Sequence, residues 1–154
     1  SEQMAEMAIS AARVVRLFGF DPKVAFVSHS TFGQPLTSRT KHIKNAVEIL
    51  KNKKVNFEFD GDMQPDVALN KEYQNLYPFS KIVGNANILI MPGQHSAAIS
   101  YKMMKELGDT KVIGPLLIGL GLPIEIAPLR SSTSEILNLA SIAAYSADVI
   151  DYKK

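Results

Sequence analysis

Hydrophobic residues in the first half of the chain follow two different spacings. Over residues 2–18 they recur every three or four positions, which predicts an amphipathic helix closed by Gly19. Residues 24–28 form a short β-branched and aromatic run after a turn, which predicts a buried strand. Residues 40–53 return to the helical spacing. The expected buried stripe of this second helix is Ile43, Ala46, Val47 and Leu50.

The middle of the chain continues this alternation of strands and helices. Phe57 and Phe59 alternate with a polar residue, which predicts a half-buried strand that ends at Asp60-Gly61. Residues 86–91 have the continuous apolar character of a strand that is covered on both faces. Helical segments are expected at residues 66–69, 72–77 and 96–107, and the last of them ends at Gly108.

The last third of the chain opens with the run Ile113 to Ile124, which is apolar and broken only by glycine and proline. It predicts a strand, a glycine turn where backbone can lie close to a ligand, and a second buried strand from Pro123. Ser131-Ser132-Thr133 then offers N-caps to a final helix. The expected buried face of that helix is Ile136, Leu139, Ala140, Ala143 and Ala144.

Strands that alternate with helices of this length predict an α/β fold with a mostly parallel sheet covered on both sides. The 154 residues suit one domain, and contents of 46% apolar and 21% charged residues are ordinary for a soluble globular protein. No apolar run reaches the roughly 18 to 20 residues of a membrane helix. The chain begins in a helical pattern without an initiator methionine, so we expect it to be a piece of a longer protein.

Composition also excludes several kinds of chemistry. The absence of cysteine excludes disulfides, zinc fingers and thiol nucleophiles, and it fits a cytoplasmic location. The 17 basic residues exceed the 15 acidic ones by too little to indicate a nucleic-acid surface. The cluster of Lys51, Lys53 and Lys54 is interpreted as a solvated helix end. Glu2 and Glu6 stand where the basic region of a signal peptide would lie.

The loop of residues 28–33 is one candidate for ligand binding. It follows the first predicted strand, and open α/β sheets bind ligands at the carboxyl ends of their strands. The hydroxyl groups of Ser28, Ser30 and Thr31 are suited to phosphate groups of a ligand. The loop lacks a glycine-rich phosphate fingerprint, so its position in the fold is the main argument for it.

Acidic residues and one histidine are weaker candidates. Asp60, Asp62 and Asp66 lack the remaining oxygen ligands of a calcium loop, so no metal site is expected and they are interpreted as turn and cap residues. His95 has a side chain suited to a general base. No serine, cysteine or carboxylate stands at a spacing that pairs with it, so a role as helix cap or in an interface is favoured over catalysis.

Motifs along nearly the whole chain carry a family resemblance. They are Phe18-Gly19-Phe20-Asp21-Pro22-Lys23-Val24-Ala25, Asp60-Gly61-Asp62-Met63-Gln64-Pro65-Asp66-Val67-Ala68-Leu69, Tyr77-Pro78-Phe79, Asn85-Ala86-Asn87-Ile88-Leu89-Ile90-Met91-Pro92, Tyr101-Lys102-Met103-Met104 and the run from Ile113 to Ile124. In this order the chain resembles the C-terminal half of the phosphotransacetylase family. His95-Ser96-Ala97 and the sequence around Arg130 resemble, more specifically, the region that follows the catalytic part of bacterial NADP-dependent malic enzymes.

This resemblance implies the architecture of the domain. Residues 1–154 would form a three-layer αβα sandwich, one lobe of the phosphotransacetylase (isocitrate dehydrogenase-like) fold. The lobe that normally packs against it lies outside these residues. A lone lobe would leave apolar surface bare, so a homo-oligomer is expected.

The resemblance also assigns positions to the family's catalytic residues. Aligned without a gap, the family's serine falls on Pro128, its arginine on Leu129 and its aspartate on Glu135. Neither proline nor leucine offers a donor to phosphate, although a one-residue bulge would bring Arg130 to the arginine position. Glu135 keeps a carboxylate, whose role is either catalysis or the favourable charge of a helix N-terminus.

The function implied by the resemblance is that of a regulatory and oligomerisation domain, with acetyl-CoA as its effector. NADP and a divalent metal would belong to an N-terminal malic enzyme region, which is the expected partner, and neither nucleic acid nor a membrane is expected. The alternatives are a working phosphate acetyltransferase, which moves acetyl between CoA and phosphate, and a dimerisation lobe without a ligand. The candidate effector-binding residues are Ser28, Ser30, Thr31, Gly119, Gly121, Arg130 and Ser131.

Overall fold

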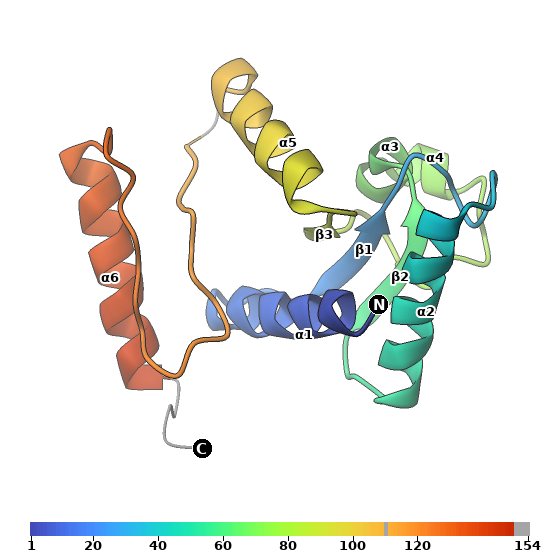
Figure 1. The fold of residues 1–154 in the computed structure, drawn as a ribbon, viewed down its shortest axis with the longest axis horizontal. Coiled ribbons are helices and arrows are strands. Elements are labelled where there is room, and N and C mark those ends of the chain that lie inside the picture. Colours follow the sequence, from blue (N-terminus) through green and yellow to red (C-terminus); the bar gives the residue numbers. More distant parts are fainter. Residues whose placement is uncertain (110, 150–154) are drawn as a thin grey trace. The chain divides into compact units, whose positions relative to one another are not determined.

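The computed structural model describes residues 1–109 and 111–149. The chain divides into two compact units, which are Ser1–Ser100 and the part from Tyr101 onward. The first unit contains all three strands, while helix α5 (Gln94–Leu107) begins in the first unit and ends in the second. Helix α6 (Thr133–Val149) belongs to the second unit, and Figure 1 shows the order of these elements along the chain.

The first unit is built on a parallel sheet of three strands in the order β2-β1-β3. The strands are β1 (Lys23–Val27), β2 (Glu58–Met63) and β3 (Ile88–Ile90). β1 pairs in parallel with both neighbours and is therefore the central strand. Its last four residues are buried, as expected for an apolar run in the middle of a covered sheet. The strands predicted in this part of the sequence are confirmed, although their bounds differ by a few residues.

Helices cover both faces of this sheet (Figure 1). On one face, α1 (Glu2–Leu17) and α2 (Ser38–Asn52) share a core cluster with Val24 and Phe26 of β1. On the other face, α3 (Pro65–Leu69) packs against Ala25 and Met63, and α4 (Lys71–Gln74) follows it. The residues that α1 and α2 bring to the first cluster include Ala5, Ala8, Ala12, Ile43, Ala46, Val47 and Leu50. The predicted α/β fold with helices on both sides of a parallel sheet is confirmed.

The ends of the first two helices agree with the residues found there. Gly19 has a φ of 83° and its N–H donates to the carbonyl of Arg16 at 2.9 Å, which closes α1 in the way a C-terminal glycine does. Thr37 and Thr40 form a reciprocal capping box at the start of α2. That capping box begins the helix slightly earlier than the hydrophobic stripe alone predicts.

Strand β2 runs through Asp60-Gly61 to Met63, so the prediction that it ends at the glycine is wrong. Gly61 has a φ of 149°, and a Cβ at this position would lie 2.7 Å from the Cβ of Phe26. The glycine therefore allows β1 and β2 to approach closely within the sheet. A glycine that looks like a turn signal in the sequence is a strand residue here.

Residues 111–132 of the second unit form no strand, so the predicted strand, turn and strand over Ile113 to Ile124 are wrong. A strand needs a neighbouring strand to pair its backbone groups, and the described elements of this unit are helices. The side chains of the run are not buried either, since Leu122 is 64% exposed and Ile124 is 48% exposed.

Helix α6 forms where its capping residues predict it, but most of its apolar face is uncovered. Leu139 is buried, as expected. Ile136 is 49% exposed, and Ala140 and Ala144 are exposed as well, so the predicted burial of these residues is wrong. The second unit offers too few packing partners to cover them. Neither α6 nor any other helix in the described part of the chain is long and apolar enough to cross a membrane.

Candidate functional site

The loop of residues 28–33 leaves the carboxyl end of β1 and is held against the end of β2. The N–H of Ser28 donates to the carbonyl of Met63 at 2.9 Å, and the N–H of Phe32 donates to the carbonyl of Asp62 at 2.6 Å. Two parallel strands therefore position this loop at their carboxyl ends, which is where sheets of this kind bind ligands.

The polar groups of this loop are bonded within the protein. Ser30 is fully buried and its Oγ donates to Oδ2 of Asp62. The N–H of Gly33 donates to the other oxygen of the same carboxylate at 3.0 Å. Oγ1 of Thr31 accepts from the N–H of Gln64 at 3.2 Å. The hydroxyls that the sequence offers to an effector thus hold the loop in place in this structure.

A cavity of about 310 Å³ opens between this loop and α2. Phe32 and Gly33 line it from the loop, residues 60–62 line it from β2, and Lys44 and Lys51 line it from α2. The carboxylates of β2 already have donors of their own, and Glu48, which also lines the cavity, is paired with Lys51. The ammonium group of Lys44 suits an anionic group of a ligand, so the cavity is one candidate in the first unit for binding a charged small molecule.

Lys51 is more than the solvated helix end that the sequence suggests. It forms an ion pair with Glu48, one turn earlier on α2. The hydrogen bond between them raises the pKa of Lys51 and lowers the pKa of Glu48. Lys44 and Lys51 are two helical turns apart, which places both on one face of α2. That spacing is the sequence signal from which the lysine wall of the cavity could have been found.

The acidic residues of β2 and α3 accept local hydrogen bonds. Asp60 accepts from the N–H of Lys81 at 2.8 Å, and Asp66 accepts from the N–H of Val67 at 2.9 Å. Asp62 binds the loop of residues 28–33, as described above. Asp66 makes the contact of a helix cap, whereas Asp60 and Asp62 are residues of strand β2, so their interpretation as turn residues is wrong. Within residues 1–109 and 111–149, no group of three histidine, cysteine, aspartate or glutamate side chains is arranged to hold a metal.

Glu135 caps the N-terminus of α6. The N–H of Ser132 donates to Oε2 of Glu135 at 2.7 Å, and the N–H of Glu135 donates back to Oγ of Ser132 at 3.2 Å. Nζ of Lys105 donates to Oε1 of the same carboxylate at 3.0 Å. The backbone N–H of Ser132, followed by the Lys105 ammonium, lowers the pKa of Glu135 to about 2. The sequence leaves two roles open for Glu135, catalysis or charge at a helix N-terminus. The contacts in the structure are those of the helix cap.

The remaining candidates lie on the irregular segment before α6. Gly119 has a φ of 81°, a conformation that favours glycine, and Gly121 follows it in the same bend. The N–H of Ser131 donates to the carbonyl of Pro128 at 2.9 Å, which closes a turn that carries Arg130. The structure thus brings Arg130 and Ser131 together in the second unit, whereas the candidates of the loop belong to the first unit.

His95 is the second residue of α5, so of the two roles predicted for it the helix cap is wrong, and the role in an interface stays a prediction. Gly93 precedes the helix, and its carbonyl accepts from Oγ of Ser96 at 2.8 Å. His95 instead lines a cavity of about 600 Å³ together with Arg39 and His42 of α2. The spacing of Arg39 and His42 on one helix is visible in the sequence. Their proximity to His95 results from the fold and is not visible in the sequence.

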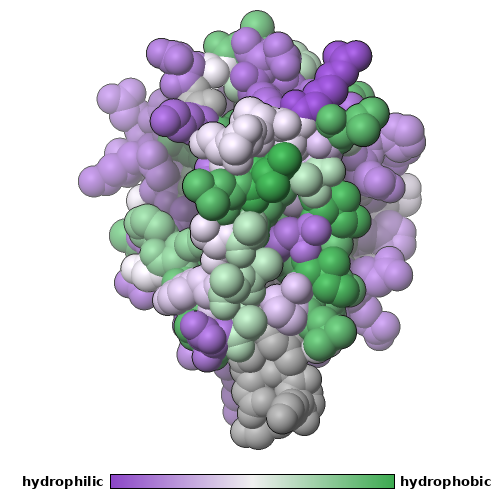
Figure 2. Space-filling model, turned by 90° about the vertical axis from the view of Figure 1, so that its left-hand side faces the viewer, coloured by the Kyte–Doolittle hydropathy of each residue, from purple (hydrophilic) through white to green (hydrophobic). Residues whose placement is uncertain are grey.

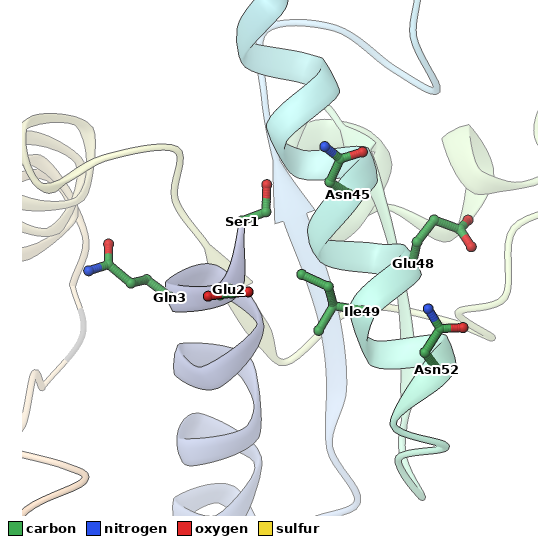
Figure 3. Close-up of a pocket in the computed structure, with 7 residues that line it drawn as sticks. All are labelled: Ser1, Glu2, Gln3, Asn45, Glu48, Ile49 and Asn52. Carbon is green, nitrogen blue, oxygen red and sulfur yellow. The ribbon is translucent and has the colours of Figure 1, made fainter.

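Another hollow, of about 620 Å³, lies between the start of α1 and the second half of α2 (Figure 3). Most of its lining residues are polar, and Figure 3 shows Asn45 and Asn52 above and below Ile49 on α2, while Gln3 points away from that helix. Its groups are those of an ordinary solvated helix surface. We therefore do not count it as a candidate site.

Comparison with known sequences gives a consistent result. The sequence profile of the phosphate acetyl/butaryl transferase family matches residues 1–144. The NADP-dependent malic enzyme of Rhizobium meliloti (strain 1021) is 47% identical over 147 residues, which cover 96% of this chain and 19% of that protein. The phosphate acetyltransferase of Clostridium acetobutylicum is 35% identical over 149 residues, which cover 96% of this chain and 45% of that protein. The chain thus spans about a fifth of the malic enzyme and less than half of the transferase.

Solved structures agree with the sequence relatives. A phosphotransacetylase from Streptococcus pyogenes superimposes with a TM-score of 0.88 at 32% identity, covering 96% of this chain and 45% of that one. The EutD phosphotransacetylase from Staphylococcus aureus gives a TM-score of 0.86 at 31% identity, covering 94% of this chain and 45% of that one. Fold and sequence therefore point to the same group of proteins.

Proposed function

Because the chain belongs to the phosphate acetyl/butaryl transferase family, we propose that it is the phosphotransacetylase-like domain of an NADP-dependent malic enzyme. The malic enzyme relative matches nearly the whole chain with 47% identity, against 35% for the phosphate acetyltransferase. In this proposal, NADP, a divalent metal and the oxidative decarboxylation of malate to pyruvate belong to the rest of the enzyme. This domain regulates the enzyme and holds its oligomer together.

One observation carries the proposal that the domain regulates rather than catalyses, namely the state of Glu135. This residue stands where the resemblance puts the family's acid, and its contacts to Ser132 and Lys105 lower its pKa to about 2. A base that removes a proton from a thiol works best with a pKa nearer to the operating pH. Leu129, where the family's arginine falls, is fully exposed and has no group that can bind phosphate.

We place the effector surface at the cavity beside the loop of residues 28–33. Acetyl-CoA carries several phosphate groups, and the ammonium group of Lys44 can attract them, whereas Lys51 is paired with Glu48. Since Ser30 is fully buried and bonded to Asp62, the loop contributes Phe32 and backbone groups rather than free hydroxyls. Regulation then requires only that acetyl-CoA bind two states of the enzyme with different affinity.

The exposed hydrophobic surface of the second unit supports the proposed oligomer. Figure 2 looks onto α6 and shows hydrophobic side chains at the surface among hydrophilic ones. Ile136 and Leu137 of α6 and Leu122 and Ile126 of the preceding segment are all exposed. Monomeric proteins rarely leave such a surface in contact with water. We propose that a second copy of the chain covers it.

Charge reversal on α2 tests the proposed effector surface. In the full-length enzyme, Lys44→Glu should raise the acetyl-CoA concentration needed for a half-maximal change in malate oxidation by about tenfold, because it places a negative charge beside the phosphate groups. Lys41→Glu is the matched control, since Lys41 is exposed on the same helix and does not line the cavity. Equal responses of the two variants would contradict the proposed location.

A second candidate is a working phosphate acetyltransferase. The similarity to the Clostridium acetobutylicum enzyme favours it, and so does Arg130, which lies one residue after the position of the family's arginine. Loss of the aligned donors should cost roughly two to three orders of magnitude in the formation of acetyl phosphate from acetyl-CoA. Activity within about tenfold of an active phosphotransacetylase would favour this candidate over the regulatory one.

A further inference from the structure

The cavity of about 600 Å³ that His95 lines has a basic wall. Arg39 and His42 reach it from the first turns of α2, and His95 reaches it from the first turn of α5. Ile43 and Pro92 contribute apolar surface. No carboxylate occurs among the described residues that line this cavity. The side chains around it therefore present positive or neutral groups only.

The two helices add to the positive potential of this cavity. Both α2 and α5 begin here, and neither has an acidic residue in its first turn. Helix N-termini attract negative charge, so Arg39 occupies a position that the helix dipole disfavours. None of the ion pairs found among the described residues includes Arg39, His42 or His95. Residues whose local placement is unfavourable tend to mark functional sites. Here the unfavourable feature is the positive charge of Arg39 at a helix N-terminus, and a bound anion would neutralise that charge.

The first turn of α5 also presents backbone donors. The first bond of this helix runs from the N–H of Ala97 to the carbonyl of Gly93 at 3.1 Å. The N–H groups of Gln94, His95 and Ser96 come before that bond and have no acceptor within the helix. They are therefore able to bind the oxygens of an anion next to the basic side chains.

We propose that this cavity binds a phosphoryl group. The guanidinium of Arg39 matches two oxygens of such a group, and the imidazoles of His42 and His95 and the amides of α5 can reach the others. The charge of Arg39, together with donors on several sides of the cavity, suits the three or more oxygens of a phosphoryl group better than the two of a carboxylate. The residues that line this cavity do not include Pro128, Leu129 or Glu135, on which the family's catalytic residues fall, or Arg130 beside them. The cavity also lies on a different face of α2 from Lys44, so it does not depend on the proposed effector cavity.

Titration of the ¹⁵N-labelled chain with inorganic phosphate, followed by NMR, tests this site. Saturable shifts are expected for the amides of Gln94, His95 and Ser96. Arg39→Gln should weaken binding by roughly tenfold or more, and the exposed His95→Gln should weaken it as well. Arg130→Gln is the matched control, since it removes the same charge from the second unit and should leave the affinity unchanged. Unchanged spectra elsewhere show that each variant is folded.

Two further ligands define the chemistry of the site. A titration with adenosine 5′-monophosphate shows whether the site prefers the phosphate group of a nucleotide or free phosphate. Tighter binding of either ligand at the α5 amides supports the site and identifies which of the two supplies the phosphoryl group. Acetate that binds as tightly as phosphate would overturn the phosphoryl assignment. The site itself would be overturned by the absence of saturable shifts in α5, or by equal losses of affinity in Arg39→Gln and Arg130→Gln.

Discussion

Gly61→Ser is a test of how β1 and β2 are joined beneath the effector cavity. Gly61 has a φ of 149°, which residues with a side chain rarely adopt. A Cβ here would lie 2.7 Å from the Cβ of Phe26 and 2.8 Å from its backbone oxygen, and that backbone cannot rotate aside. Backbone strain and overpacking each cost about 1–3 kcal/mol, so the free energy of unfolding should fall by roughly 2–6 kcal/mol.

Thermal unfolding followed by circular dichroism measures this loss. A domain of this size loses about 2–4 °C in melting temperature for each kcal/mol, so Gly61→Ser should melt at least about 4 °C lower. Gly93→Ser is the matched control, because a Cβ at Gly93 meets no atom within 4 Å and serine is favoured immediately before a helix. It should change the melting temperature by about 2 °C or less. Equal shifts in the two variants would refute this reasoning.

In an NMR titration, Glu135 should stay ionised until the pH falls to about 2. Its stabilisation of the α6 cap should therefore be complete above the usual pKa of 4.5 and be lost as the pH falls through about 2. A titration midpoint near pH 4.5 would contradict the capping geometry. Asp62→Ala should lower the free energy of unfolding in urea by about 3 kcal/mol, because Ser30 and Gly33 lose their acceptor, and a loss below about 1 kcal/mol would show that this carboxylate does not hold the loop. Light scattering at micromolar concentration should give a dimer or larger species, and a clean monomer would refute the proposed oligomer.

The elements of the first unit could be predicted because their signals are local. The helical spacing before Gly19 and the apolar residues of β1 identify an amphipathic helix and a buried strand without knowledge of their neighbours. Gly61 shows the limit of this reasoning. Its role in β2 depends on the approach of Phe26 from another strand, which the sequence around the glycine does not contain.

The second unit shows why an apolar run is not sufficient evidence for a strand. The run Ile113 to Ile124 has suitable residues, but among residues 101–109 and 111–149 of this unit no strand lies beside it to complete its hydrogen bonds. The same lack of partners leaves Ile136 of α6 exposed. Burial is a property of the whole assembly, so a sequence pattern predicts the face of a helix that can be buried and not whether it is.

The candidate site was partly visible in the sequence. The position of the loop after β1 follows from the general location of ligand sites in parallel sheets. The bond between Ser30 and Asp62 joins the loop after β1 to strand β2, and it gives an expected ligand-binding hydroxyl a structural role. The position of His95 and Arg39 around one cavity likewise requires the fold to bring the first turn of α5 to the start of α2. Contacts between distant segments are the part that local patterns do not specify.

The response of malate oxidation to acetyl-CoA in the full-length enzyme, with and without this domain, tests the central claim most directly. The account predicts that acetyl-CoA changes the kinetics of the intact enzyme by a coupling of about 1–3 kcal/mol, or about 5- to 150-fold in affinity. Deletion of the domain should abolish this response and leave some basal dehydrogenase activity. A truncated enzyme that still responds to acetyl-CoA at the same concentration as the intact enzyme would contradict the regulatory role.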